Sequence, residues 1–127
     1  MEIGQKASLT KAFTHDDIMS YAQVSLDNNP IHVDEEFAKT TRFGTRIVQG
    51  ILVTGLISAV IATKLPGAGA IYLNQTVSFR YPVYINDVIT ATVEVISIDG
   101  AKIGLSTTCF NQDGKVVIEG SALVLVK

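Results

Sequence analysis

The sequence is short of cysteine and of charge. Its single cysteine, Cys109, has no partner for a disulfide within the 127 residues, and the alternating apolar run around it predicts a packed strand residue rather than a nucleophile. Charged residues make up 17% of the chain against 47% hydrophobic residues, and the net charge is −2. This balance excludes the broad basic surface of nucleic-acid-binding proteins. So little charge on a small domain also predicts that another subunit covers part of the apolar surface.

Targeting and membrane-spanning segments are missing as well. The longest apolar stretch, residues 50–63, is too short to cross a bilayer, and the first six residues contain no apolar signal region. We therefore expect a cytoplasmic protein that makes no membrane contact. No repeat, low-complexity segment or linker interrupts the chain, so we expect one domain over residues 1–127, long enough to bury a core.

Two segments have the pattern of helices. Thr14 and Asp17 have the spacing of a capping box, which predicts a helix that begins there and runs to about Val24. Residues 50–64 are apolar around most of the helical circumference, so this helix should be buried on nearly all sides. Leu65-Pro66-Gly67 should end it.

The second half of the chain has the pattern of antiparallel strands. Asp99-Gly100 and Asp113-Gly114 separate apolar-alternating runs and are strong hairpin signals. An apolar helix followed by such a meander fits an α+β domain in which a sheet wraps around a central helix. Strands are expected over residues 70–81, 88–98, 103–110 and 116–126, with an edge strand over 6–13.

The segment from Asp27 to His32 is the strongest candidate for chemistry. It places a carboxylate and an imidazole five positions apart across a turn in which Asn28 and Asn29 tolerate unusual backbone angles and Pro30 fixes φ. A carboxylate near an imidazole can activate water, since one group takes a proton while the other orients the water or returns a proton. The alternative is a capped turn that carries an ordinary loop histidine. We call residues 27–32 the elbow.

The elbow and its surroundings resemble a known signature. Residues 21–32, with Ala38 six positions later, are similar to the pattern of the MaoC-like (R)-specific enoyl-CoA hydratases: an aromatic residue, Asp-x-Asn-Pro-aliphatic-His, and then a small residue. Residues 43–50, the apolar helix after them, and residues 69–73 and 77–79 follow the same family in order and spacing. The resemblance covers essentially the whole chain and implies the hot-dog fold, a sheet wrapped around a long helix.

The resemblance also implies a reaction. Water adds syn to a trans-2-enoyl-CoA and gives the (R)-3-hydroxyacyl product, with Asp27 and His32 as the residues that act on the water. The backbone N–H of Gly50, at a helix start, is the candidate donor to the thioester oxygen, because helix N-termini present unpaired N–H groups; otherwise Gly50 merely starts the helix. Ser58 either orients the catalytic pair or bonds back to the Thr54 carbonyl.

Two further residues are candidates for substrate binding. Asn29 belongs to the elbow, and Ile61 follows Ser58 by three positions on one helix face. A β-branched side chain at this position should shorten an acyl tunnel and favour chains of roughly four to eight carbons. Alternatively, Ile61 packs only against the sheet.

Metal ligands and cofactor motifs are not expected. Residues 32–36 combine a histidine with three acids, but a second histidine at a workable spacing is missing, and the acids fit a helix N-terminus opening near Asp34. Coenzyme A would enter only as part of the substrate.

The chain departs from the family pattern twice. Leu26 stands where many members carry glycine, which should alter a backbone angle only. Gln49 stands where many carry histidine, which removes a possible polar contact near the thioester.

Several alternatives remain open. A 3-hydroxyacyl-ACP dehydratase would run the reverse reaction on a carrier protein, a hot-dog thioesterase fits the elbow less well, and a non-catalytic acyl-CoA-binding protein has no need of Asp27 and His32. The product could feed polyhydroxyalkanoate synthesis, fermentation or fatty acid oxidation. We expect a homodimer, or a dimer of dimers, joined through sheet edges.

Overall fold

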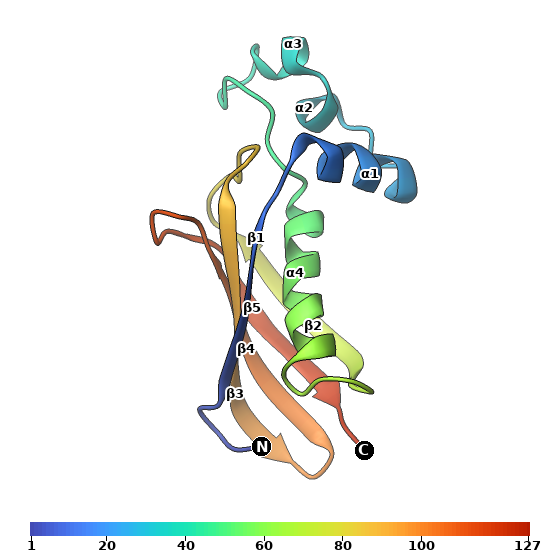
Figure 1. Cartoon of the computed structure of the whole chain (residues 1–127), viewed down its shortest axis with the longest axis vertical. Helices are drawn as coiled ribbons and strands as arrows, with labels where there is room; N and C mark the ends of the chain where they lie inside the picture. The colour runs from blue at the N-terminus through green and yellow to red at the C-terminus, as the bar shows by residue number, and fades with distance from the viewer.

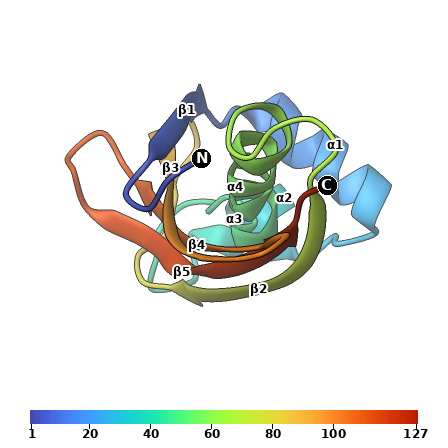
Figure 2. The same ribbon diagram turned by 90° about the horizontal axis from the view of Figure 1, so that it is seen from below.

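A curved antiparallel sheet of five strands wraps around one long helix in the computed structural model, which describes all residues from Met1 to Lys127 (Figures 1 and 2). The strand order across the sheet is β1-β3-β4-β5-β2. The strands are β1 Lys6–Ala12, β2 Ile71–Phe79, β3 Val88–Asp99, β4 Lys102–Phe110 and β5 Val116–Leu125, and the helices are α1 His15–Ser25, α2 Pro30–Val33, α3 Glu35–Ala38 and α4 Gly50–Thr63.

All five expected strands are present, and the hot-dog fold is confirmed. The strands β3, β4 and β5 form the expected meander, and β1 is an edge strand. Gly100 and Gly114 have φ of 59° and 76°, the left-handed region that a tight hairpin needs and that glycine enters without strain. The other edge strand, β2, pairs antiparallel with β5 and not with its neighbour in the sequence, β3. The sheet therefore has two open edges.

The helix α4 has one buried face and one uncovered face. Five of its side chains are buried toward the sheet: Val53, Leu56, Ile57, Val60 and Ile61. On the opposite side Ile51 is 57% exposed. The expectation of burial on nearly all sides is therefore wrong for a single chain, because the sheet curves around only part of the helix. An apolar composition cannot distinguish a face that the chain covers itself from one that it leaves open.

Cys109 confirms its expected place in a strand. It lies on β4 with no exposed surface, and burial raises the pKa of its thiol to about 12. A thiol with that pKa contains almost no thiolate near neutral pH, so Cys109 is a packing residue.

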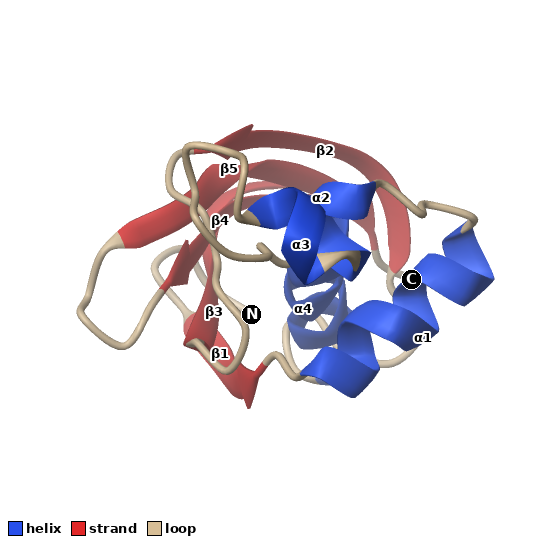
Figure 3. Ribbon diagram, turned by 90° about the horizontal axis from the view of Figure 1, so that it is seen from above, coloured by secondary structure: helices blue, strands red, loops and turns tan.

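Three helices lie over the N-terminal end of α4 (Figure 3). The first of them, α1, begins with the expected capping box: the Asp17 N–H donates to Thr14 Oγ1 over 3.2 Å, and the Thr14 N–H donates to Asp17 Oδ2 over 3.0 Å. Asp34 caps α3 by accepting from the Phe37 N–H, as expected of an acidic helix start. None of the four helices is both long and apolar enough to cross a membrane. This group of short helices carries the elbow.

Candidate active site

A strained residue, Leu26, directly precedes the elbow. Leu26 ends α1 with φ 68° and ψ 11°, in the left-handed region, and its side chain is 81% exposed. A left-handed conformation costs an L-residue free energy but costs glycine little. The structure does not show the altered backbone angle expected of this departure, because leucine occupies the left-handed conformation that favours glycine.

Replacing Leu26 by glycine should stabilise the protein. Relief of the left-handed strain, about 1–2 kcal/mol, exceeds the entropy cost of glycine, about 0.5–1 kcal/mol, so we expect a gain of roughly 0.5–1 kcal/mol in the free energy of unfolding. Urea unfolding measures it. Val24→Gly is the matched control, because Val24 is 83% exposed but helical, and it should lose about 0.5 kcal/mol. Equal losses in both variants would contradict the strain.

Two side chains of the elbow accept hydrogen bonds from its backbone N–H groups. Asp27 Oδ1 accepts from the Asn29 N–H over 3.3 Å, and Asn29 Oδ1 accepts from the Ile31 N–H over 3.2 Å. Pro30 then opens a single helical turn, α2, where the sequence suggested only a bend. Asn29 thus serves as the N-cap of α2. Its binding to a substrate stays a prediction.

The imidazole of His32 is oriented by a contact across the chain. His32 Nδ1 lies 2.8 Å from the carbonyl oxygen of Ile47, and the Ile47 N–H donates to the Ile31 carbonyl over 3.3 Å. A carbonyl can only accept, so Nδ1 carries the hydrogen and the neutral ring keeps its lone pair on Nε2. The ring therefore offers a proton acceptor on the nitrogen directed away from Ile47.

A second set of contacts secures the elbow, and the sequence did not indicate it. Arg46 donates from Nη1 to the His32 carbonyl over 3.4 Å and from Nη2 to His15 Nδ1 over 2.9 Å, and its Nε lies 3.7 Å from Glu35 Oε1. Hydrogen bonds from Thr45, and the nearby guanidinium, hold the pKa of Glu35 below its usual range. The Arg46 side chain is only 12% exposed, so it is used within the fold and not offered to an anionic ligand.

The start of α4 lies beside the elbow and is left without a cap. The first N–H groups of a helix, here including that of Gly50, have no intrahelical acceptor. The N-cap residue Gln49 makes no side-chain capping bond that would replace one. A Cβ on Gly50 would lie 2.5 Å from Cε1 of the Phe79 ring. Glycine thus allows Phe79 to pack against a helix end with free donors and a positive dipole.

Gln49 has a different place from the one that the family pattern suggests. Its side chain is buried, and Nε2 donates to the Ile18 carbonyl over 3.1 Å, which ties α1 to the start of α4. The amide faces α1, and its Oε1 is buried without a hydrogen-bond partner.

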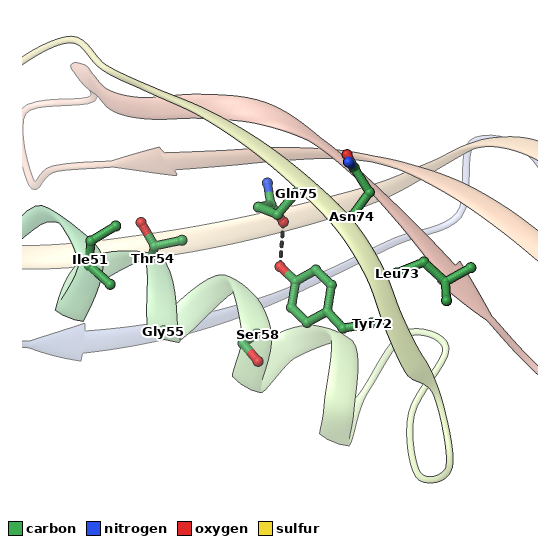
Figure 4. Close-up of a pocket in the computed structure, with 8 residues that line it drawn as sticks. All are labelled: Ile51, Thr54, Gly55, Ser58, Tyr72, Leu73, Asn74 and Gln75. Atoms are coloured by element: carbon green, nitrogen blue, oxygen red, sulfur yellow. Dashed lines mark hydrogen bonds between the residues drawn. The ribbon is translucent and has the colours of Figure 1, made fainter. Parts of the chain in front are cut away.

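Ser58 lies apart from the elbow within one chain. It lines a groove of about 440 Å³ between the uncovered face of α4 and strand β2, which neither Asp27 nor His32 lines (Figure 4). Its hydroxyl makes none of the hydrogen bonds considered above, to Asp27, His32 or the Thr54 carbonyl. Its orienting role stays a prediction.

Ile61 is 2% exposed, belongs to the core cluster and lines none of the cavities. Its effect on acyl length also stays a prediction. No group of three or more histidine, cysteine, aspartate or glutamate side chains is placed to hold a metal ion.

The proteins that this chain resembles include hydratases and dehydratases. A family model described as "MaoC like domain" matches residues 2–112. An (R)-specific enoyl-CoA hydratase of Rhodospirillum rubrum is 51% identical over 125 residues, which cover 97% of this chain and 86% of the relative. A mitochondrial 3-hydroxyacyl-[acyl-carrier-protein] dehydratase of Solanum lycopersicum is 39% identical, over 99% of this chain and 78% of the relative. The solved (R)-hydratase of Aeromonas caviae involved in PHA biosynthesis superposes with a TM-score of 0.97 at 40% identity, over 100% and 98% of the two chains.

Proposed function

This chain belongs to the MaoC-like domain family, and we propose that it is an (R)-specific enoyl-CoA hydratase, which adds water reversibly to trans-2-enoyl-CoA. The observation that carries the proposal is the likeness over nearly the full length to an (R)-specific enoyl-CoA hydratase, together with an elbow that keeps both titratable residues. The uncapped start of α4 beside that elbow supports the same chemistry.

In the proposed reaction the residues of the elbow act on one water molecule. Asp27 and His32 share the two proton transfers: one group removes a proton as the water oxygen bonds to Cβ, and one proton is delivered to Cα. His32 can accept at Nε2, because Nδ1 is occupied by the Ile47 carbonyl. Negative charge builds on the thioester oxygen, and the Gly50 N–H at the positive end of α4 is the donor that stabilises it. No cofactor or metal takes part, and coenzyme A belongs to the substrate.

The experiment is hydration of crotonyl-CoA, followed as loss of absorbance of the enoyl-thioester band, with chiral analysis of the product. We expect the (R)-3-hydroxy product. The (S) product, or no turnover by the folded protein, would contradict the proposal.

The 3-hydroxyacyl-ACP dehydratase is the second candidate, since two plant mitochondrial relatives carry that name. A higher kcat/KM with crotonyl-ACP than with crotonyl-CoA would favour it.

The chain should act as a homodimer, or as a dimer of dimers, with each site near the interface. The uncovered face of α4 and the adjoining open edge of β2 support this arrangement, because Ile51, Ile71 and Leu73 expose 57%, 45% and 47% of their surface there. An unpaired strand edge beside apolar side chains is readily covered by a second copy. Sedimentation that finds an active monomer at micromolar concentration would contradict the dimer.

A further inference from the structure

Strand β2 contains a bulge that places two polar side chains on one face. Its pairing with β5 shifts between Tyr72 and Asn74, so Leu73 is the extra residue. Tyr72 lies opposite Val124, and Gln75 lies opposite Ala122; both partners are buried on the α4 side of the sheet. Residues three apart in a regular strand point to opposite faces, so the bulge is what brings both side chains into the groove.

These two side chains are joined to a buried third. The Tyr72 hydroxyl donates to Gln75 Oε1 (Figure 4). Gln75 Nε2 donates to Thr107 Oγ1 over 2.9 Å and to the Thr76 carbonyl over 2.8 Å. Thr107 lies on β4 with no exposed surface. Both the oxygen and the nitrogen of the Gln75 amide therefore form hydrogen bonds within the fold, and these bonds fix the position of the Tyr72 phenol. A tyrosine anchored in this way acts as a rigid wall rather than as a mobile side chain.

The wall lies at a definite distance from the proposed reaction centre. His32 is anchored at Ile47, three residues before Gly50, so the elbow and the Gly50 N–H both lie at the N-terminal end of α4. From there the groove passes Ile51 and Thr54 and reaches Ser58, beside the Tyr72 ring. Eight residues of helix from Gly50 to Ser58 span about 12 Å. An extended acyl chain advances about 1.25 Å per C–C bond, because its zigzag shortens each bond of about 1.5 Å along the axis, so a chain of roughly ten carbons has that length.

We infer that Tyr72, anchored by Gln75 and Thr107, is a specificity-determining residue that ends the acyl groove and limits this protein to short and medium acyl chains. This inference rests on the proposed function, in which the second copy of the homodimer lies over the mouth of the groove and closes it into a tunnel. Tyr72 is the largest side chain lining the groove, whereas Ile61 is buried in the core. The groove should accept four- and eight-carbon chains and reject a twelve-carbon chain.

Binding of saturated acyl-CoA tests the inference without requiring turnover. Butyryl-, octanoyl- and dodecanoyl-CoA cannot be hydrated, and calorimetric titration gives a Kd for each. Wild type should bind dodecanoyl-CoA at least about tenfold more weakly than octanoyl-CoA, a difference of about 1.4 kcal/mol. Tyr72→Ala should remove that difference. Tyr72→Phe keeps the ring but loses the hydrogen bond to Gln75, so its preference for octanoyl-CoA over dodecanoyl-CoA should lie between that of wild type and that of Tyr72→Ala.

Tyr81→Ala is the matched control, because Tyr81 is an exposed tyrosine that follows β2 and does not line the groove; the ratios of its Kd values for the three acyl-CoAs should equal those of wild type. Should Tyr72→Ala fail to fold, Tyr72→Leu replaces it, with a smaller gain expected for the long chain. An unchanged profile in the folded Tyr72 variants, or a gain in Ile61→Ala alone, would overturn the inference. If wild type fails to hydrate crotonyl-CoA while the binding profile shifts as expected, the proposed function fails and the role of Tyr72 stands.

Discussion

Replacing Asp27 by asparagine, or His32 by glutamine, should each lower kcat at least about a hundredfold, as expected when a general acid or base is lost. Both substitutions keep the approximate size of the side chain and remove its ability to exchange a proton. The amide oxygen of an asparagine at position 27 can still accept from the Asn29 N–H, and the amide of a glutamine at position 32 can still donate to the Ile47 carbonyl, so the backbone of the elbow should persist.

Hydration of crotonyl-CoA measures both effects, with the unfolding midpoint as a check on the fold. Asn28→Ala is the matched control: Asn28 is an exposed residue of the elbow whose side chain makes no hydrogen bond, so turnover should stay near that of wild type. Near-normal turnover in either purified, folded variant would remove that residue from the mechanism. A similar loss in Asn28→Ala would show that the elbow is sensitive to any substitution.

Replacing Gly120 by alanine should cost about 3 kcal/mol or more in the free energy of unfolding. A Cβ at this position would overlap the carbonyl oxygen of Thr76 and lie 2.7 Å from its carbonyl carbon. These atoms belong to the backbone of β2 and cannot rotate away. Since β2 pairs only with β5, the alanine should force the two strands apart and loosen the groove beside α4.

Urea denaturation measures this loss as a lower midpoint. Ser121→Ala is the neighbouring control, because it removes only an exposed hydroxyl that contacts Thr76 Oγ1, and it should cost no more than about 1 kcal/mol. A midpoint for Gly120→Ala that matches the control would mean that β2 can shift to accept a methyl group.

The elements of the fold were predictable because their signals are local. Alternation over the three meander strands, with Asp-Gly between them, identifies hairpins from adjacent residues alone. The pairing of β2 with β5 joins residues 39 to 54 positions apart, such as Thr76 and Ser121, and the periodicity of the sequence contains no information on it. The bulge at Leu73 is hidden for the same reason, since an extra residue is defined only against a partner strand.

For the candidate site, the sequence indicates residue types but not their contacts, and the roles of those residues stay predictions. Asp27 and His32 are recognisable because they flank a rigid turn. The Ile47 carbonyl that orients His32 belongs to the backbone, which leaves no mark in a side-chain pattern. In the sequence Arg46 cannot be distinguished from a surface cation, and only the structure shows its contacts with His32, His15 and Glu35. Ser58 lies on the expected helix, but helical spacing cannot say how far that helix face lies from the elbow.

The Ile47 carbonyl also bears on how the site recovers after each turnover. The Nδ1–H that it binds is present in both the neutral and the protonated imidazole. His32 can therefore gain and lose its Nε2 proton while its anchoring bond remains, with neither a ring flip nor a change of tautomer. The imidazole ends a cycle in the orientation in which it began, so the forward and reverse reactions can start from one resting arrangement. Such an arrangement suits an enzyme whose direction is set by the concentrations of its substrates.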